Sequence, residues 1–237
     1  DSVASFDAPT GRLHWQGERK ATFDTAEAVA SPVLYHDRLL CLAAWNRGSM
    51  MLRLDPQKPA ASVLWRTTGK PTTMLSTPVF QGDRHFFATL GNGHLACLNS
   101  ADGGEIWSTR DPVKGRLGTA HLTPNGDRVF LFNQTGHLIL ARLTRTGFTE
   151  LGRALLVEPT AGFRPQGPLT WAHPAYANKC VFARNDHELV CASLAADGTA
   201  TSLSATTEIR SHVPPGFPEG NVALAFSPDG KALAAGS

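Results

Sequence analysis

The residues best suited to chemistry in this 237-residue sequence are its histidines, because imidazoles ligate metals and exchange protons near neutral pH. His94, His137 and His187 recur beside equivalent predicted turns of three repeat units. Equivalent turns of neighbouring units lie much farther apart than metal–ligand distances of about 2 Å allow. We therefore expect solvated loop histidines and no metal site.

Cysteines are the second candidates, at positions 41, 97, 180 and 191, and none has C-x-x-C spacing. Cys180 and Cys191 flank a predicted hairpin with a two-residue turn centred between Asn185 and Asp186, which would place them directly opposite each other. A disulfide there would be strained, because bridges between neighbouring strands fit the bond geometry poorly. Two buried thiols are the favoured state.

No local catalytic motif is present: there is no G-x-S-x-G, no H-E-x-x-H and no phosphate-binding glycine loop. The net charge of +2 is too small to indicate a nucleic-acid-binding protein. No run of about 18 apolar residues predicts a membrane span. We expect neither an enzyme nor a bound cofactor.

Basic side chains gather in three consecutive predicted loops between residues 66 and 169. The seven are Arg66, Lys70, Arg110, Lys114, Arg116, Arg153 and Arg164, against Asp111 and Glu158, an excess of five positive charges. Two stretches rich in Pro and Gly, 158–168 and 212–219, add Phe163 and Phe217. This pattern predicts a face that contacts a protein partner with an acidic surface; ordinary solvated charge is the alternative.

The elements that carry these residues follow a repeat. Residues 93–107 read as two strands with period-two apolar alternation, separated by the turn formers Asp102-Gly103-Gly104. Trp15, Trp65 and Trp107 are 50 and 42 residues apart, and three Asp-Arg pairs at 37–38, 83–84 and 127–128 keep a similar period. A period in the forties with four short strands predicts the blade of a β-propeller.

In such a blade, we expect each tryptophan to fill the wedge between neighbouring blades rather than to stack on a ligand. The Asp-Arg pairs are interpreted as turn chemistry between the first and second strands.

The chain is predicted to be one all-β domain with four whole blades, at about 29–66, 75–108, 118–151 and 170–206. A fifth would combine 220–237 with 1–15. Two interpretations are open: a closed ring of five blades, or a fragment of a larger propeller. The sequence begins at Asp1 without a leader pattern, which predicts a signal peptide absent or already removed. The compartment stays open, with the cytoplasm slightly favoured over the periplasm.

D-A-P-T-G-R-L-H-W (7–15) and G-H-L-A-C-L-N-S-A-D-G-G-E-I-W (93–107) resemble the repeat of quinoprotein-type propellers, a family whose non-enzymatic members include an outer-membrane assembly lipoprotein. A-L-A-F-S-P-D-G-K-A-L-A-A-G-S (223–237) is similar to the first half of a WD40 repeat. Redox members of the quinoprotein family place an adjacent Cys-Cys pair against their cofactor, and this sequence has none. The resemblance implies a binding platform within a larger protein.

These observations predict a non-catalytic protein-interaction scaffold or sensor module. The alternatives are a quinone- or sugar-processing enzyme and a lectin-like carbohydrate binder. The predicted first strands carry mostly apolar or neutral side chains, which disfavours an enzyme in the central funnel. The loops differ in length and charge, which disfavours a lectin with one site per blade.

Overall fold

The computed structural model describes residues 2–18, 30–44, 48–73, 75–113, 118–163, 167–195, 223–226 and 233–236. Within these ranges all regular structure is β-strand, so the predicted all-β class is confirmed. This part of the chain contains no helix long and apolar enough to cross a membrane.

Three four-stranded antiparallel sheets form the main body, and the strands of each lie side by side in sequence order. The first sheet contains β3 (Val33–Tyr35), β4 (Arg38–Leu42), β5 (Ser49–Leu54) and β6 (Ala61–Arg66). The second contains β7 (Val79–Phe80), β8 (His85–Leu90), β9 (His94–Asn99) and β10 (Glu105–Thr109). The third contains β11 (Ala120–Asn125), β12 (Arg128–Asn133), β13 (His137–Thr144) and β14 (Gly147–Leu155).

Smaller sheets account for the other described strands. The fourth sheet has three strands, β17 (Ala175–Ala177), β18 (Cys180–Arg184) and β19 (Leu189–Ser193). Its predicted last strand, near 200–205, lies outside the described residues. Three hairpins complete the set: β1 (Ser2–Phe6) with β2 (Leu13–Glu18), β15 (Ala161–Phe163) with β16 (Gly167–Leu169), and β20 (Ala223–Phe226) with β21 (Leu233–Gly236). The β15–β16 hairpin lies where the sequence predicted only a contact loop.

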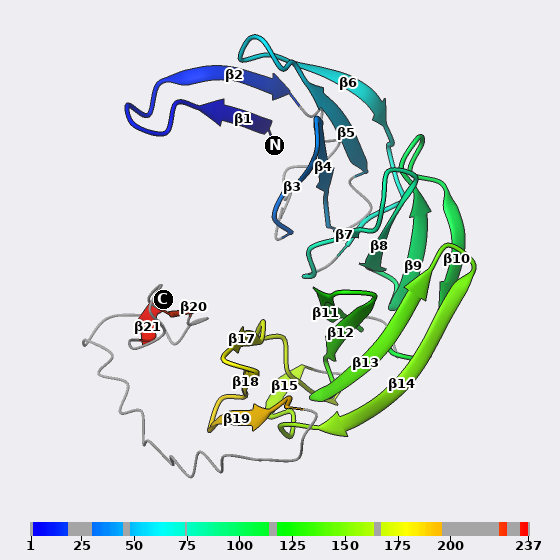
Figure 1. The fold of residues 1–237 in the computed structure, drawn as a ribbon, viewed down its shortest axis with the longest axis vertical. Helices are drawn as coiled ribbons and strands as arrows, with labels where there is room; N and C mark the ends of the chain where they lie inside the picture. The colour runs from blue at the N-terminus through cyan, green and yellow to red at the C-terminus, as the bar shows by residue number, and fades with distance from the viewer. Residues whose placement is uncertain are drawn as a thin grey trace.

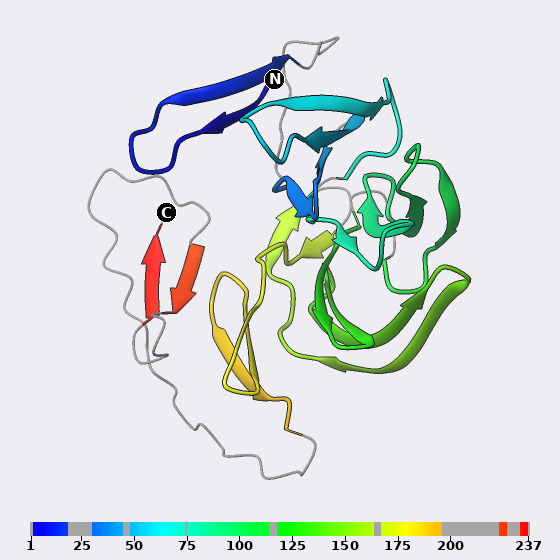
Figure 2. The ribbon, with the colours of Figure 1, turned by 45° about the horizontal axis from the view of Figure 1, so that its top comes forward.

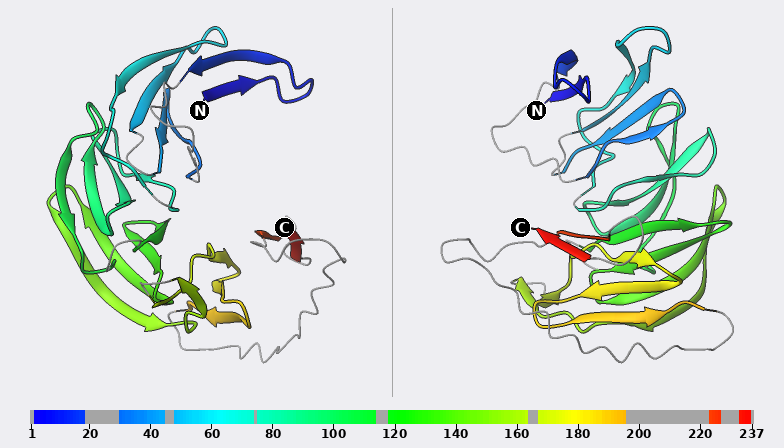
Figure 3. Two further views of the ribbon diagram at one scale, coloured as in Figure 1. Left: turned by 180° about the vertical axis from the view of Figure 1, so that it is seen from behind. Right: turned by 60° about the vertical axis from the view of Figure 1, so that its left-hand side comes forward.

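The sheets stack face to face around a common centre, with β3, β7, β11 and β17 innermost (Figure 1; Figure 3, right). This is the predicted β-propeller architecture. The arc is open, because β1 and β21 belong to separate two-stranded sheets and lie apart (Figure 2). The union of 220–237 with 1–15 in one blade therefore stays a prediction.

In the first three sheets the middle strands are largely buried on both faces, because each of these sheets packs between two neighbours. In β8, Phe86 and Ala88 pack toward the first sheet, whereas the alternating residue Phe87 packs toward the third. Five consecutive residues of β8 are buried. Successive side chains of a middle strand therefore point into two different apolar interfaces, and both interfaces remove large side chains from water.

A tryptophan on the last strand links each of the first two sheets to the next. Trp65 packs against buried residues of the second sheet, and its indole Nε1 donates to the Ser100 carbonyl at 2.9 Å. Trp107 repeats this arrangement, packing against the third sheet and donating to the Thr144 carbonyl at 3.0 Å. Trp15 of β2 packs against Met50 of the first sheet. The Trp65 and Trp107 indoles each fill an interface and satisfy their N–H across that interface.

A β-bulge precedes the tryptophan in each of these strands. Met51 pairs with Trp65 and Leu52 with Val63, so Leu64 is the extra residue. Ile106 occupies the same place in β10. In the third sheet the bulge falls at Leu151, and the position that follows it is Gly152 instead of tryptophan. A Cβ added at Gly152 would meet nothing within 4 Å, so this interface lacks the indole and has space where it would lie.

The hairpin between β18 and β19 corrects one prediction. Arg184 pairs with Leu189, so the turn has four residues rather than two. Asn185 Oδ1 accepts hydrogen bonds from the backbone N–H groups of His187 and Glu188 at 2.7 and 2.8 Å, which stabilises the longer turn. Register therefore shifts by two residues: Cys191 pairs with Phe182, and Cys180 pairs with Ser193. Both cysteines are free thiols, placed diagonally rather than directly opposite.

Gly103 provides a test of the tryptophan contact, because a Cβ there would lie 3.0 Å from the Trp65 ring at a φ of +75°. Gly82 has a φ of +74° and nothing within 4 Å, so it is a matched control. We expect Gly103→Ala to lower the free energy of unfolding by about 1 kcal/mol more than Gly82→Ala, which reports backbone strain alone. Chemical denaturation measures both, and the excess should disappear in a Trp65→Phe background. An equal loss in the two variants would contradict the contact.

Candidate functional site

The propeller presents two opposite faces, defined by which connections reach them. Because the strands of each sheet lie in sequence order, the second-to-third-strand hairpin and the link to the next sheet share one end. We call this the link face: the hairpins after β4, β8, β12 and β18 and the links after β6, β10 and β14. The turns between first and second strands and between third and fourth strands form the turn face.

Four of the seven predicted cations are described, and all four are exposed at the link-face ends of their sheets. They are Arg66 at the end of β6, Lys70 in the link that follows, Arg110 directly after β10, and Arg153 in β14. Lys114, Arg116, Arg164 and Phe217 lie outside the described residues, and Phe163 is the last residue of β15.

The structure brings Lys70 and Arg110 together around His94. Arg110 Nε donates to His94 Nε2 at 2.6 Å, so that ring nitrogen is an acceptor. The pKa of His94 is lowered, first by burial and then by the positive charges of Arg110 and, more weakly, Lys70, while Glu105 opposes them. His94 is therefore neutral at pH 7 and leaves the two cations to set the local potential.

Arg153 contributes less to the link face than its charge suggests. Its Nε and Nη2 donate to the two carboxylate oxygens of Glu150 at 2.7 and 2.5 Å. These bonds raise the pKa of Arg153 and lower that of Glu150. Residues three apart in a strand normally point to opposite sides, but the bulge at Leu151 brings this pair together. Of the four described cations of the link face, Lys70 and Arg110 are the two that act on His94.

His94, His137 and His187 lie in hairpins of three different sheets. Among the described residues, no group of three or more His, Cys, Asp or Glu side chains is close enough to hold a metal ion.

Two histidines meet at the inner strands, a feature that sequence reasoning missed when it treated those strands as apolar or neutral. His121 of β11 and His173, just before β17, have ring centroids 4.4 Å apart. His121 Nε2 donates to the Trp171 carbonyl at 2.9 Å. Burial, with the nearby His173 as the second cause, lowers the pKa of His121 to about 4. The two histidines are 52 positions apart in the sequence, and they meet because the third sheet stacks on the fourth, so no local sequence pattern indicates the pair.

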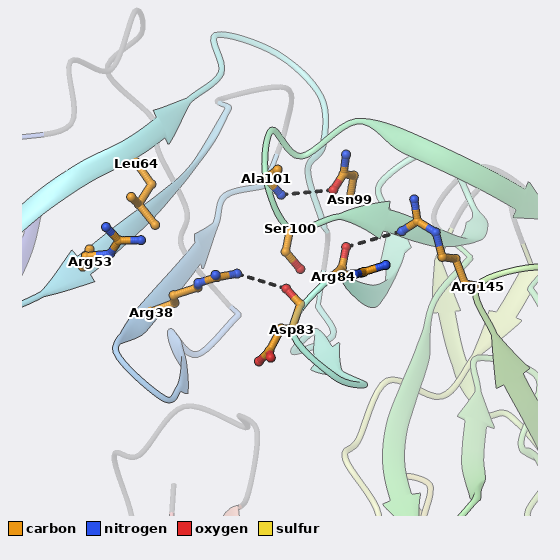
Figure 4. Close-up of a pocket in the computed structure, with 9 residues that line it drawn as sticks. All are labelled: Arg38, Arg53, Leu64, Asp83, Arg84, Asn99, Ser100, Ala101 and Arg145. Atoms are coloured by element: carbon orange, nitrogen blue, oxygen red, sulfur yellow. Dashed lines mark hydrogen bonds between the residues drawn. The ribbon is translucent and has the colours of Figure 1, made fainter.

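The turn face carries a second basic feature, a hollow of about 540 Å³ where the first three sheets meet (Figure 4). Four arginines line it together with Leu64, Asp83, Asn99, Ser100 and Ala101; they are Arg38, Arg53, Arg84 and Arg145. Sequence reasoning had assigned the Asp-Arg pairs to turn chemistry alone. The regular spacing of the Asp-Arg pairs could have indicated this hollow, because turns that recur in each blade place their arginines on the same face of the propeller.

Stacked four-stranded sheets joined by tryptophans define the class of protein as a β-propeller. Residues 1–160 match the family described as outer membrane protein assembly factor BamB, and the chain belongs to this family. No curated protein matches the chain.

Two solved structures share the fold. BamB from Moraxella catarrhalis has a TM-score of 0.54 and 14% identity, over 81% of this chain and 55% of that one. The β-propeller domain of Myceliophteria thermophila Cps50 (Swd1) has a TM-score of 0.52 and 16% identity, over 81% of this chain and 62% of that one. This chain therefore spans less than two thirds of either.

The buried His121 predicts a pH dependence of stability. Its pKa is about 4 in the folded protein against 6.5 for the free side chain, so the unfolded chain binds a proton more readily between these values. The free energy of unfolding should fall as pH falls from 6.5 to 4, by about 3 kcal/mol from this residue. Denaturation at several pH values should show a smaller slope for His121→Gln and the wild-type slope for the exposed control His187→Gln. Equal slopes for both variants would refute this assignment.

Proposed function

We propose that this chain is a non-catalytic protein-docking module, and that its link face binds an acidic surface of a partner protein. Membership of a family described as an assembly factor supports a scaffold role.

The convergence of Lys70 and Arg110 on His94 carries this proposal. The two cations come from consecutive links, and both act on His94: Arg110 through a hydrogen bond and Lys70 through its charge. Neighbouring cations accelerate encounter with a carboxylate-bearing surface, and the anchored Arg110 side chain costs less ordering when that surface docks. Lys114, Arg116 and Arg164 extend the proposed surface along the sequence, and Phe163 and Phe217 supply apolar contacts in it.

Charge reversal on the link face tests this proposal. The partner is first identified by cross-linking in the cells that make the protein, then purified and titrated calorimetrically. We expect Lys70→Glu with Arg110→Glu to weaken its binding by about tenfold or more, most strongly at low ionic strength. Thermal stability should be unchanged, because both side chains are exposed. The corresponding reversal of Lys114, Arg116 and Arg164 should weaken binding in the same way.

Arg12→Glu is the matched control, because Arg12 is exposed in the β1–β2 turn and carries the same charge. It should leave the affinity unchanged. Wild-type affinity in the Lys70→Glu, Arg110→Glu variant would reject the link face as the docking surface. Turnover of a small molecule by the purified chain would reject the non-catalytic role.

A further inference from the structure

We propose that the arginine-lined hollow on the turn face is a second binding site, which takes an extended acidic peptide segment of a partner protein. This proposal goes beyond the link-face docking described above and does not depend on it. The hollow lies where the first three sheets meet: Arg38 and Arg53 come from the first, Arg84 from the second and Arg145 from the third (Figure 4).

The hollow carries an uncompensated positive charge. Only Arg53 has a carboxylate partner, Asp37, with Nε 3.3 Å from Oδ2. Within the described part of the chain, Arg38, Arg84 and Arg145 have no carboxylate within 4.0 Å. The one lining carboxylate, Asp83, lies 3.7 Å from His36 Nε2 instead. Because guanidinium groups cannot lose their charge near neutral pH, the site favours an anion.

The second sheet departs from the repeat beside the hollow. In the first sheet, Arg38 at the start of the second strand pairs in register with Arg53. The same positions of the second sheet hold His85 and Asn99. The turn before His85 has four residues, 81–84, against two in the first sheet, 36–37, so Arg84 lies within the turn and points its charge at the hollow rather than along the strand. In the first and third sheets an arginine of the third strand forms an ion pair with the aspartate of the turn before the second strand: Arg53 with Asp37, and Arg142 with Asp127 at 2.9 Å. The second sheet has Asn99 at this position and lacks that ion pair.

Backbone acceptors hold two of the arginines in place. Arg38 Nη1 donates to the Asp83 carbonyl at 3.0 Å, and Arg145 Nη1 makes a long hydrogen bond of 3.5 Å to the Arg84 carbonyl. Each bond connects a different neighbouring sheet to the same turn. Arg145 also contributes, after burial, to the lowered pKa of His85 beside this turn. Guanidinium groups anchored in this way are ordered before a ligand arrives, and each retains free N–H donors.

The shape and lining favour a peptide. A volume of about 540 Å³ lies within the roughly 300–1,000 Å³ range of ligand pockets, which suits a few side chains rather than a whole protein surface. Leu64, the bulge residue of β6, is 38% exposed and gives the hollow an apolar wall. None of the nine lining residues is aromatic, so the hollow offers no platform for stacked bases. Carboxylates with apolar neighbours on an extended segment match both the arginines and the leucine.

The test measures fluorescence anisotropy of a short labelled peptide that alternates glutamate and leucine, against the same peptide with glutamine. We expect the glutamate peptide to bind, and Arg84→Glu with Arg145→Glu to weaken its binding by about tenfold or more. Arg84→Gln with Arg145→Gln should give a smaller loss, which separates lost attraction from added repulsion. The link-face variant Lys70→Glu with Arg110→Glu carries the same charge change and should retain wild-type affinity. Unfolding transitions confirm that each variant is folded.

Three results would overturn the proposal: equal binding of the glutamine peptide, equal loss in the link-face variant, or wild-type affinity in the Arg84→Glu, Arg145→Glu variant. Tighter binding of an oligothymidylate through the same arginines would identify a nucleic acid as the ligand instead of a peptide and would also overturn the proposal.

The two proposals can fail independently of each other. If the partner requires Lys70 and Arg110 but the acidic peptide binds the Arg84→Glu, Arg145→Glu variant normally, only the peptide site in the hollow is rejected. If the peptide requires Arg84 and Arg145 but the partner binds the Lys70→Glu, Arg110→Glu variant normally, only the link-face docking is rejected.

Discussion

The structure depends on the stacking of neighbouring sheets, because no sheet alone can cover both faces of its apolar middle strands. Phe86 and Phe87 are adjacent in β8 yet belong to different interfaces. Trp65 and Trp107 add a hydrogen bond across the same interfaces to the apolar contact. The relative placement of neighbouring sheets is thereby fixed, and any site made from two sheets inherits that fixed geometry.

Both basic surfaces follow from this arrangement, at opposite ends of the same sheets. On the link face, consecutive links bring Lys70 and Arg110 to one hairpin histidine. On the turn face, turns of three sheets bring four arginines to one hollow. The inner strands instead join His121 to His173, and burial keeps the pKa of His121 low, so that His121 is uncharged at neutral pH. The charged groups able to recognise a partner thus lie on the two outer faces rather than at the described inner strands.

Sequence reasoning predicted the propeller because its signals are local: alternation, turn formers and a period in the forties all act within one blade. It failed where the outcome depends on the length of a turn or on a neighbouring sheet. Asn185 stabilises a four-residue turn and shifts the Cys180 register. The Leu151 bulge lets Glu150 neutralise Arg153. The arginine hollow forms only where three sheets meet, so the sequence of a single blade cannot indicate it.

Gly152 leaves the interface between the third and fourth sheets without the indole that the two preceding interfaces have. Where the first two sheets each anchor the next with an indole, the third has only Gly152, and the apolar cluster between the third and fourth sheets has fewer fully buried members than that between the second and third. Amide hydrogens of β17–β19 should therefore exchange with solvent through local opening, at a lower free energy than those of β4–β13. We therefore expect the first three blades to open as one cooperative unit and the described strands of the fourth to open more readily, and a partner that spans both would slow that exchange.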